Sequence, residues 1–355
     1  MAPASVSRRH VLGLGAGVAA RWVAGGGSSR ALAAPKYVPG STWTTVDPGE
    51  AGWDPAGLRA VVRFAGERRS TTLLVVHRGR IVAERSWGPS AGQPREIASC
   101  QKSVVSLLAG RAAARGLLDR DDRVSAHLGE GWSNAPTEDE RRICLRHLLT
   151  MTSGLNGQLR VVAPPGTVWP YNNVAYHVLQ PVLEEATGRG IDNLSRRWLW
   201  APLGAGESTW RPRPGNGPNA VDPKGRRLWG LAMTAREMGR FGLLVQRRGR
   251  WAEDQILPRE ELVRALTPSS ELNPSYGELW WLNGHDGWRR GPNGALQPGP
   301  FVASAPDDMV GAFGRDGQRI YVVRSADLVV VRQGEPPGGD FDTELWRRLQ
   351  AARPA

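Results

Sequence analysis

Residues 97–108, with the sequence IASCQKSVVSLL, are predicted to form a buried helix that opens with a candidate nucleophile. Apolar side chains would lie nearly all round this helix, and Gly116 can end it. Ser99 and Lys102 are three residues apart, so they share one face of the first turn. This stretch therefore predicts both the central helix of the fold and the place of its chemistry.

The pair Ser99 and Lys102 can perform nucleophilic catalysis. A serine hydroxyl is a weak nucleophile until a base takes its proton. Lysine can be that base only when it is neutral, and burial in an apolar helix lowers its pKa. Backbone N–H groups at the start of a helix can also stabilise the negative charge of a tetrahedral intermediate. We therefore predict Ser99 as the nucleophile and Lys102 as its base.

An S-x-x-K spacing also arises by chance, and it then marks only a solvated serine and lysine. The chain holds 46 Lys and Arg residues, and its only lysines are Lys36, Lys102 and Lys224. One of these few lysines lies in the apolar helix, where arginine could not serve as a base because it stays protonated. This choice of residue favours catalysis over the solvated pair.

The composition excludes several functional classes. The chain has 355 residues and a net charge of +12 that comes almost wholly from scattered arginines. After the first forty residues no basic run is interleaved with aromatic residues, so we expect no nucleic-acid partner. Cys100 and Cys144 cannot form a disulfide framework, and the histidines lack the spacing of metal ligands. We expect no metal and no cofactor.

Residues 1–33 have the pattern of a twin-arginine export signal. Arg8 and Arg9 are followed by a weakly apolar run, and residues 31–33, ALA, offer a small-x-small cleavage site. The alternative is a disordered Gly/Ala/Arg tail. We expect export to the periplasm, the cell surface or the medium. Beyond this segment no apolar run approaches the length of a membrane-spanning helix, so we expect no stable membrane insertion.

Strand patterns occur at the two ends of the chain, and the middle is mostly helical. Asp54 can cap a first helix, and a short apolar helix is predicted over residues 142–155. Alternating patterns predict strands at residues 72–77, 80–87, 279–282, 319–323 and 328–332. We predict an α+β fold, with a discontinuous sheet domain at residues 34–116 and 270–355 and a mostly helical lobe at 117–269. The site would lie in the cleft between them.

Further motifs give the chain a family resemblance. They are the S-x-x-K helix, residues 147–155 (HLLTMTSGL), 164–167 (PPGT) and 171–173 (YNN). Together they resemble the serine β-lactamase and penicillin-binding-protein superfamily. The closer resemblance is to class C β-lactamase-like hydrolases, including esterases and 6-aminohexanoate-dimer hydrolases. It implies a β-lactamase/transpeptidase-like fold, with an antiparallel sheet flanked by helices and an inserted helical lobe. One catalytic unit would span about residues 45–350.

The second motif of the resemblance is Y-x-N, at Tyr171 and Asn173. In an extended segment these two side chains point the same way, so both can reach the cleft. Near Lys102, Tyr171 is expected to have a lowered pKa and to act as a base or proton shuttle. Asn173 is expected to bind Lys102 or a substrate amide. The alternative is a buried tyrosine followed by a turn asparagine.

The third motif departs from the lactamase pattern. Lactamases carry a cationic or histidine residue, a hydroxyl residue and a glycine on the edge strand, where they hold the substrate carboxylate. Ala312, Phe313 and Gly314 occupy that position here, just before the predicted strand at 319–323. Phe313 and Gly314 would then contact the substrate, and the backbone N–H of Arg315 would complete the oxyanion hole with that of Ser99. A glycine-rich turn is the structural alternative.

These observations predict an exported serine hydrolase that cleaves a small-molecule ester or amide through an acyl-enzyme on Ser99. Lys102 and Tyr171 would serve as general base and acid. Three alternatives remain open from the sequence. The first is a β-lactamase or D,D-peptidase, and the second is an acyltransferase that passes the acyl group to an amine or alcohol. The third is a non-catalytic binding module on the same fold.

Overall fold

A computed structural model of the chain describes residues 37–88, 92–290 and 294–354. They belong to one compact unit, Lys36–Ala355. The predicted export signal at residues 1–33 lies outside the described residues. Within the described ranges, no helix has the length and apolar character needed to cross a membrane.

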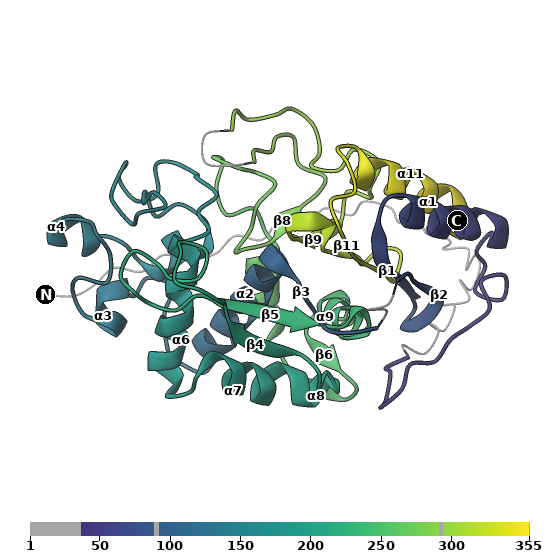
Figure 1. Ribbon diagram of the computed structural model, residues 1–355, viewed down its shortest axis with the longest axis horizontal. Coiled ribbons are helices and arrows are strands. Elements are labelled where there is room, and N and C mark those ends of the chain that lie inside the picture. The colour runs from purple at the N-terminus through teal and green to yellow at the C-terminus, as the bar shows by residue number, and fades with distance from the viewer. Residues whose placement is uncertain (1–36, 89–91, 291–293, 355) are drawn as a thin grey trace, which may run out of the picture. The chain divides into compact units, whose positions relative to one another are not determined.

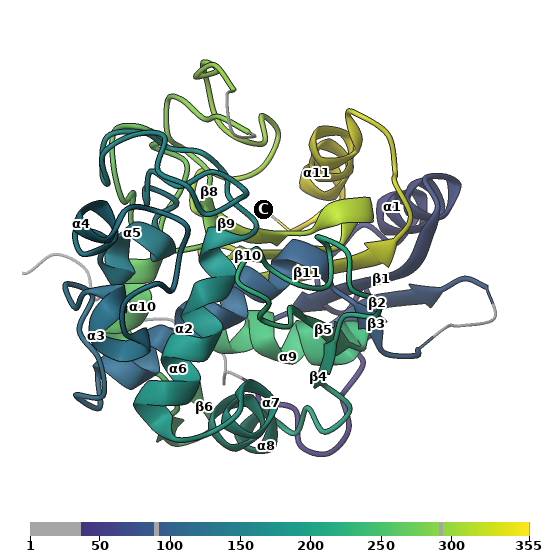
Figure 2. The ribbon, with the colours of Figure 1, turned by 60° about the vertical axis from the view of Figure 1, so that its left-hand side comes forward.

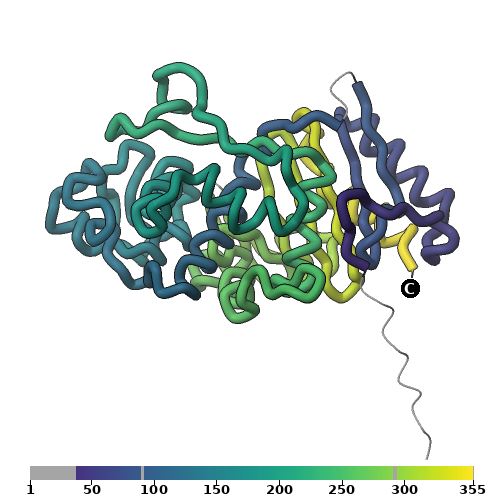
Figure 3. The backbone as a smooth tube through the Cα atoms, turned by 90° about the horizontal axis from the view of Figure 1, so that it is seen from below, coloured from purple at the N-terminus to yellow at the C-terminus, as the bar shows by residue number. Residues whose placement is uncertain are grey.

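The central sheet is built from both ends of the chain. Its six strands run in the order β2-β1-β11-β10-β9-β8, and every neighbouring pair is antiparallel. Figure 3 shows strands from the two ends, purple to blue and yellow, lying side by side. The strands are β1 (Ser70–His77), β2 (Arg80–Ser86), β8 (Trp281–Leu282), β9 (Met309–Phe313), β10 (Arg319–Val323) and β11 (Leu328–Gly334). The predicted α+β fold is confirmed.

Helices cover both faces of this sheet. In Figure 2, α1 (Pro55–Glu67) and α11 (Phe341–Ala352) lie above the sheet, and α2 (Gln101–Ala113) and α9 (Ala235–Gln246) lie below it. Because both faces are covered, the central strands are continuous apolar runs rather than alternating ones. All seven residues of β11 are buried.

The first helix begins where the sequence predicts. The Asp54 side chain accepts hydrogen bonds from the backbone N–H groups of Ala56 and Gly57, which caps α1. Phe64 of α1 stacks on Phe341 of α11 with ring centroids 5.6 Å apart, so the first and last helices pack together (Figure 1). This contact joins two segments from opposite ends of the described chain.

The middle of the chain is mostly helical and contributes strands to two small sheets. One small sheet has the order β3-β5-β4 and consists of β3 (Arg95–Glu96), β4 (Thr209–Pro212) and β5 (Trp229–Met233). The other pairs β6 (Arg250–Trp251) with β7 (Asp254–Gln255). The remaining α-helices are α3 (Val124–Leu128), α4 (Thr137–Glu140), α5 (Leu145–Leu149), α6 (Leu179–Thr187), α7 (Ile191–Ser195), α8 (Ala201–Leu203) and α10 (Arg259–Ala265). Shorter turns are η1 (Ala98–Cys100), η2 (Ala175–Val178), η3 (Arg196–Trp200, a π-helical turn) and η4 (Arg315–Gly317).

Two predicted elements differ from the structure. The helix predicted over residues 142–155 is only α5, because Thr150 leaves the helical conformation and Met151 takes a φ of 61°. The glycine-rich segment before β10 contains a further strand, β9. In the sheet, β9 lies between β10 and the edge strand β8. The sequence concealed β9 because Gly311 and Ala312 have low strand propensity.

Candidate active site

A small sheet holds the turn that carries the predicted nucleophile. Ile97 donates its backbone N–H to Leu231 of β5 (2.9 Å), and the Gln101 side chain accepts from Leu231 N–H (3.1 Å). Between them, Ala98 has a φ of 48°, which is unusual for a residue with a Cβ. Ser99 follows in η1, so a backbone fixed from both sides presents it at the start of α2.

The structure brings Ser99, Lys102 and Asn173 into one hydrogen-bonded group. Lys102 Nζ lies 2.9 Å from Ser99 Oγ and 2.8 Å from Asn173 Oδ1, and it donates to both oxygens. When the amine is neutral, the same 2.9 Å separation allows the Ser99 hydroxyl to donate to the nitrogen lone pair instead. A neutral amine at this position is within reach of the Ser99 hydroxyl proton.

Burial favours the neutral form of Lys102. Only 3% of the residue is exposed. Desolvation lowers the pKa of Lys102 well below its ordinary value, and the nearby charge of Arg213 lowers it further, although the neighbouring Cys100 opposes the shift. Among the described residues, no carboxylate forms an ion pair with its ammonium group. The predicted neutral base has the surroundings that it needs.

Asn172 fixes the Y-x-N segment. Its side-chain N–H donates to the carbonyl groups of Leu155 (2.7 Å) and Asn156 (3.1 Å), and its Oδ1 accepts from Val174 N–H (2.9 Å) and from the next residue. These bonds join the segment to the first residue of η2 and to the loop after α5. The flanking Tyr171 and Asn173 are held in place as a result.

Tyr171 lies in an aromatic cluster, which changes its expected role. Its ring stacks on Trp281 (6.1 Å between centroids) and meets Trp169 (6.1 Å) and Tyr276 (6.4 Å). Burial raises the pKa of Tyr171 above its ordinary value, although hydrogen bonding with the Ser99 side chain partly offsets this. The lowered pKa that the sequence predicts is therefore wrong. With its pKa raised, the phenol stays protonated at neutral pH and is not a standing base.

Gly314 and Arg315 lie against the turn before the nucleophile. A Cβ on Gly314 would come within 2.5 Å of the carbonyl oxygen of Ile97, so only glycine permits this approach. Within the described residues, neither Ser99 N–H nor Arg315 N–H donates a backbone hydrogen bond. Binding of an oxyanion by these two N–H groups stays a prediction. The Arg315 side chain is 78% exposed and lies 3.6 Å from Asp316.

Phe313 is part of the aromatic cluster. The residue is 8% exposed, and its ring lies 4.9 Å from Phe301, 5.5 Å from Tyr321 and 6.5 Å from Trp281, measured between centroids. Trp281 is the ring that stacks on Tyr171, so Phe313 supports the wall of the site. Its direct contact with a substrate stays a prediction.

Sequence reasoning missed two residues that surround Lys102. The Tyr176 ring lies 4.1 Å from Lys102 Nζ, and its hydroxyl is held by the buried side chain of Gln101. Arg213 follows β4 and pairs with Glu96 at 2.9 Å. The sequence did offer a signal for Tyr176, because it lies five residues after Tyr171 in an apolar segment. Arg213 reaches the site only through tertiary packing, and no local pattern marks it.

A cavity of about 990 Å³ opens beside Tyr171 and Asn173. Its lining is rich in apolar groups and includes Leu155, Val162, Val168 and Trp169. Val162 is 62% exposed, although it is a large apolar residue. No group of three or more His, Cys, Asp or Glu residues in the described part of the chain could hold a metal ion. The cavity thus adjoins the group of Ser99, Lys102 and Asn173 at Asn173 and Tyr171.

The Beta-lactamase family profile matches residues 58–353, which include every residue of this site. The chain belongs to the Beta-lactamase family. It is therefore a member of the serine hydrolase superfamily that contains β-lactamases and penicillin-binding proteins. The resemblance inferred from the motifs is confirmed.

Two curated relatives are penicillin-binding proteins by name. Penicillin-binding protein 4 of Amycolatopsis lactamdurans is 24% identical over 308 residues, which cover 70% of this chain and 79% of that protein. A Bacillus subtilis (strain 168) protein, provisionally named penicillin-binding protein PbpX, is 26% identical over 162 residues. That match covers 38% of this chain and 40% of the relative, so the alignment spans less than half of that protein's length.

Solved structures show the same fold. A Bacillus anthracis protein, provisionally named a 6-aminohexanoate-dimer hydrolase, has a TM-score of 0.64 at 17% identity, covering 87% of this chain and 86% of that one. A class C β-lactamase in complex with cefoxitin has a TM-score of 0.64 at 15% identity, covering 86% of this chain and 99% of that one. At these identities the likeness establishes the fold.

Proposed function

We propose that this protein is an exported serine hydrolase that cleaves an uncharged ester or amide through an acyl-enzyme on Ser99. One observation carries the proposal. The buried amine of Lys102 contacts Ser99 Oγ at 2.9 Å while Asn173 Oδ1 accepts from it at 2.8 Å. An amine held this way, without a carboxylate to keep it charged, is suited to remove the serine proton.

The first half of the reaction acylates the enzyme. Neutral Lys102 takes the proton of Ser99, whose Oγ attacks the substrate carbonyl carbon. The backbone N–H groups of Ser99 and Arg315 bind the resulting oxyanion. The tetrahedral intermediate then collapses, the bond to the leaving group breaks, and the protonated Tyr171 or Lys102 gives the leaving group a proton. The acyl group remains on Ser99 as an ester.

Water completes the cycle. A water molecule attacks the acyl carbon, and its proton passes to Lys102 or to Tyr171, whichever was left deprotonated. Ser99 Oγ leaves and regains a proton, which releases the carboxylic acid. The raised pKa of Tyr171 makes a lasting phenolate unfavourable, so the phenol acts as a proton carrier rather than as a standing base.

The lining of the site supports a small substrate with an apolar part. The cavity beside Tyr171 is about 990 Å³ and carries exposed valines. Ala312 and Phe313 stand where a lactamase has its cation and hydroxyl, and neither can hold a carboxylate. Burying an unpaired carboxylate is unfavourable. Uncharged short-chain esters therefore fit this site better than anionic substrates do.

A matched pair of serine variants tests the proposal. Ser99→Ala should abolish hydrolysis of p-nitrophenyl butyrate, a loss of several orders of magnitude. Ser106→Ala is the control, because Ser106 is buried in the same helix and its hydroxyl has no hydrogen-bond partner within the described residues. It should retain full activity. Equal activities of the two variants would refute a role for Ser99.

A β-lactamase or D,D-peptidase is the second candidate, and one observation favours it. The guanidinium of Arg290 stacks 4.8 Å from the Phe301 ring centroid, and its charge lowers the pKa of Tyr171. A cation that acts on Tyr171 could bind a substrate carboxylate although Ala312 and Phe313 cannot. This candidate predicts efficient cephalosporin cleavage that is lost in Arg290→Gln.

A further inference from the structure

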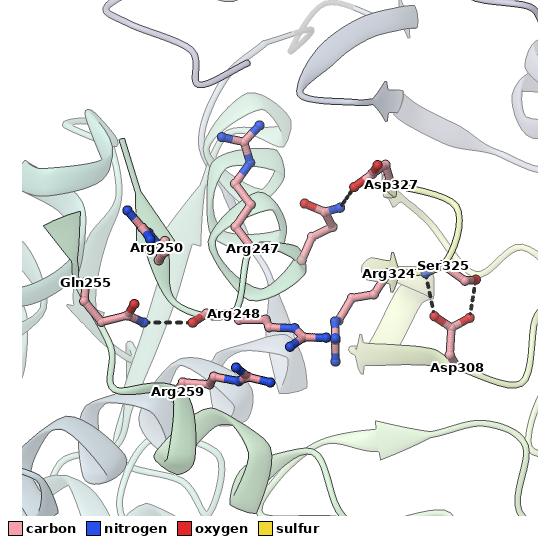
Figure 4. A pocket seen from close by; sticks show the side chains of 10 residues that line it. Arg247, Arg248, Arg250, Gln255, Arg259, Asp308, Arg324, Ser325 and Asp327 are labelled. Carbon is pink, nitrogen blue, oxygen red and sulfur yellow. Dashed lines mark hydrogen bonds between the residues drawn. The ribbon is translucent and has the colours of Figure 1, made fainter. Parts of the chain in front are cut away.

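A second hollow lies outside the proposed active site. It has a volume of about 750 Å³ and is lined by the end of α9, the β6–β7 hairpin, the start of α10 and the turn between β10 and β11 (Figure 4). It shares no lining residue with the cavity beside Tyr171. The proposed catalytic reaction therefore does not explain which residues line this hollow.

The lining of this hollow is strongly basic. Its five arginines are Arg247, Arg248, Arg250, Arg259 and Arg324, and its carboxylates are Asp308 and Asp327. Both carboxylates already bind neutral groups. Asp308 accepts from the backbone N–H (2.7 Å) and the hydroxyl (2.8 Å) of Ser325, and Asp327 accepts from the side chain of Gln246. The lining thus holds five guanidinium groups against two carboxylates.

Arg248, Arg259 and Arg324 form the centre of this charge. Their side chains make no ion pair or hydrogen bond with the described part of the chain. Figure 4 shows the guanidinium groups of Arg248 and Arg324 facing each other, with Arg259 extending toward them from α10. Burial lowers the pKa of Arg324; Arg248 and Arg259 lower it further, and Asp308 opposes them. The three cations repel one another unless an anion lies between them.

The backbone holds two of these arginines in place. Gln255 Nε2 donates to the carbonyl groups of Arg248 (2.9 Å) and Leu257 (2.6 Å), which closes the loop that carries Arg248. Next to it, Gly249 has a φ of 81°, and a Cβ there would come within 2.1 Å of the Leu257 carbonyl oxygen. Arg324 directly precedes Ser325, whose bonds to Asp308 fix the β10–β11 turn. The hollow is thus built on ordered backbone.

We propose that this hollow binds a soluble small molecule that carries a phosphate or pyrophosphate group. Guanidinium groups are planar, keep their charge and match phosphate oxygens in paired hydrogen bonds. Three of them converging on one hollow suit a ligand with several anionic oxygens. A concave site favours a molecule that enters it over the flat surface of a membrane. The site is independent of the ester chemistry at Ser99.

Calorimetric titration with inorganic pyrophosphate tests this proposal. The wild-type protein should bind it, and Arg248→Gln with Arg324→Gln should weaken binding by about tenfold or more, because the charge-assisted bonds are lost. The control is Arg59→Gln with Arg85→Gln, which removes the same charge from exposed positions on α1 and β2. The control should change the affinity by less than about twofold, since exposed distant charges are screened.

Two results would overturn the proposal. If both double variants weaken binding equally, binding depends only on net charge, and the hollow is not a specific site for pyrophosphate. If the wild type does not bind pyrophosphate but binds phosphatidylglycerol vesicles, the arginines bind a lipid surface and not a soluble ligand. Retained hydrolysis of p-nitrophenyl butyrate by Arg248→Gln with Arg324→Gln would show that the variant is folded.

Discussion

Lys102 Nζ lies 2.8 Å from Asn173 Oδ1, although the two residues are 71 positions apart in the chain. Lys102 belongs to the first turns of α2, and Asn173 belongs to the loop that Asn172 anchors before η2. An amide oxygen orients the amine without adding a negative charge. The contact therefore positions the lysine and still allows it to be neutral, which a carboxylate at the same place would prevent.

Asn173→Asp should raise the pKa of Lys102. Desolvation lowers this pKa in the native site, and a carboxylate at hydrogen-bonding distance would oppose that effect. Since only the neutral amine is a base, activity rises as pH rises through this pKa. The rising limb of the kcat/KM profile should move to higher pH, and activity at pH 7 should fall. The profile is measured with a short p-nitrophenyl ester.

Asn173→Ala is the control for this shift. It removes the acceptor but adds no charge, so kcat should fall with little movement of the rising limb. If the profiles of the two variants coincide, the charge state of Lys102 does not govern activity, and Lys102 is not the base.

Lys102→Arg should be nearly inactive although the positive charge is kept. Arginine cannot lose its proton in a protein, so it cannot serve as a base at any working pH. We expect less than about a tenth of the wild-type kcat/KM, since a positioned base typically contributes at least about a hundredfold. Higher retained activity would remove Lys102 from the proposed mechanism.

Lys102→Met should be inactive but more stable than the wild type. The pKa of Lys102 is lower in the folded chain than in the unfolded chain, so burying its charge costs stability. This cost is fully present below the folded pKa and is relieved as pH rises toward the unfolded value of about 10.4. The gain in Tm should therefore be larger at pH 6 than at pH 9, by at least about 2 °C. A variant less stable at both pH values would indicate that the amine's hydrogen bonds outweigh its desolvation.

Substrate choice separates an esterase from a β-lactamase. We expect p-nitrophenyl butyrate to exceed nitrocefin in kcat/KM by at least about a hundredfold, because Ala312 and Phe313 leave a carboxylate unpaired. Both substrates are compared on one preparation, together with Arg290→Gln. Comparable efficiencies, with nitrocefin cleavage reduced in Arg290→Gln, would favour the lactamase and identify the cation that holds its substrate.

Export is tested with the signal itself. Arg8→Lys with Arg9→Lys should leave a full-length precursor in the cytoplasm, because a receptor reads the arginine pair and not charge alone. Immunoblots of cell fractions measure the distribution. Normal export of the double variant would contradict a twin-arginine signal.

Local patterns were enough to predict the nucleophile helix, the cap at Asp54 and the sheet built from both ends of the chain. Ser99 and Lys102 share a helix turn, so spacing alone could place them together. Asn173 was expected to bind Lys102 or a substrate amide, and its Oδ1 lies 2.8 Å from Lys102 Nζ. These features depend on neighbours in sequence or on motifs with a fixed geometry.

Tertiary surroundings decided what the sequence could not. The pKa of Tyr171 was expected to be lowered by Lys102, but the rings of Trp281, Tyr276 and Trp169 desolvate the phenol and raise it. Arg213 acts on Lys102 from the end of β4, more than a hundred residues away in sequence. Such effects depend on which distant segments pack together, and no local sequence pattern predicts them.

Covalent labelling shows whether Ser99 is the nucleophile. The folded protein is treated with a fluorophosphonate, its intact mass is measured, and the modified peptide is mapped by tandem mass spectrometry. We expect a single adduct on Ser99, absent from Ser99→Ala and unchanged in Ser106→Ala. A folded protein that takes up no probe, or an adduct that persists in Ser99→Ala, would contradict this role of Ser99.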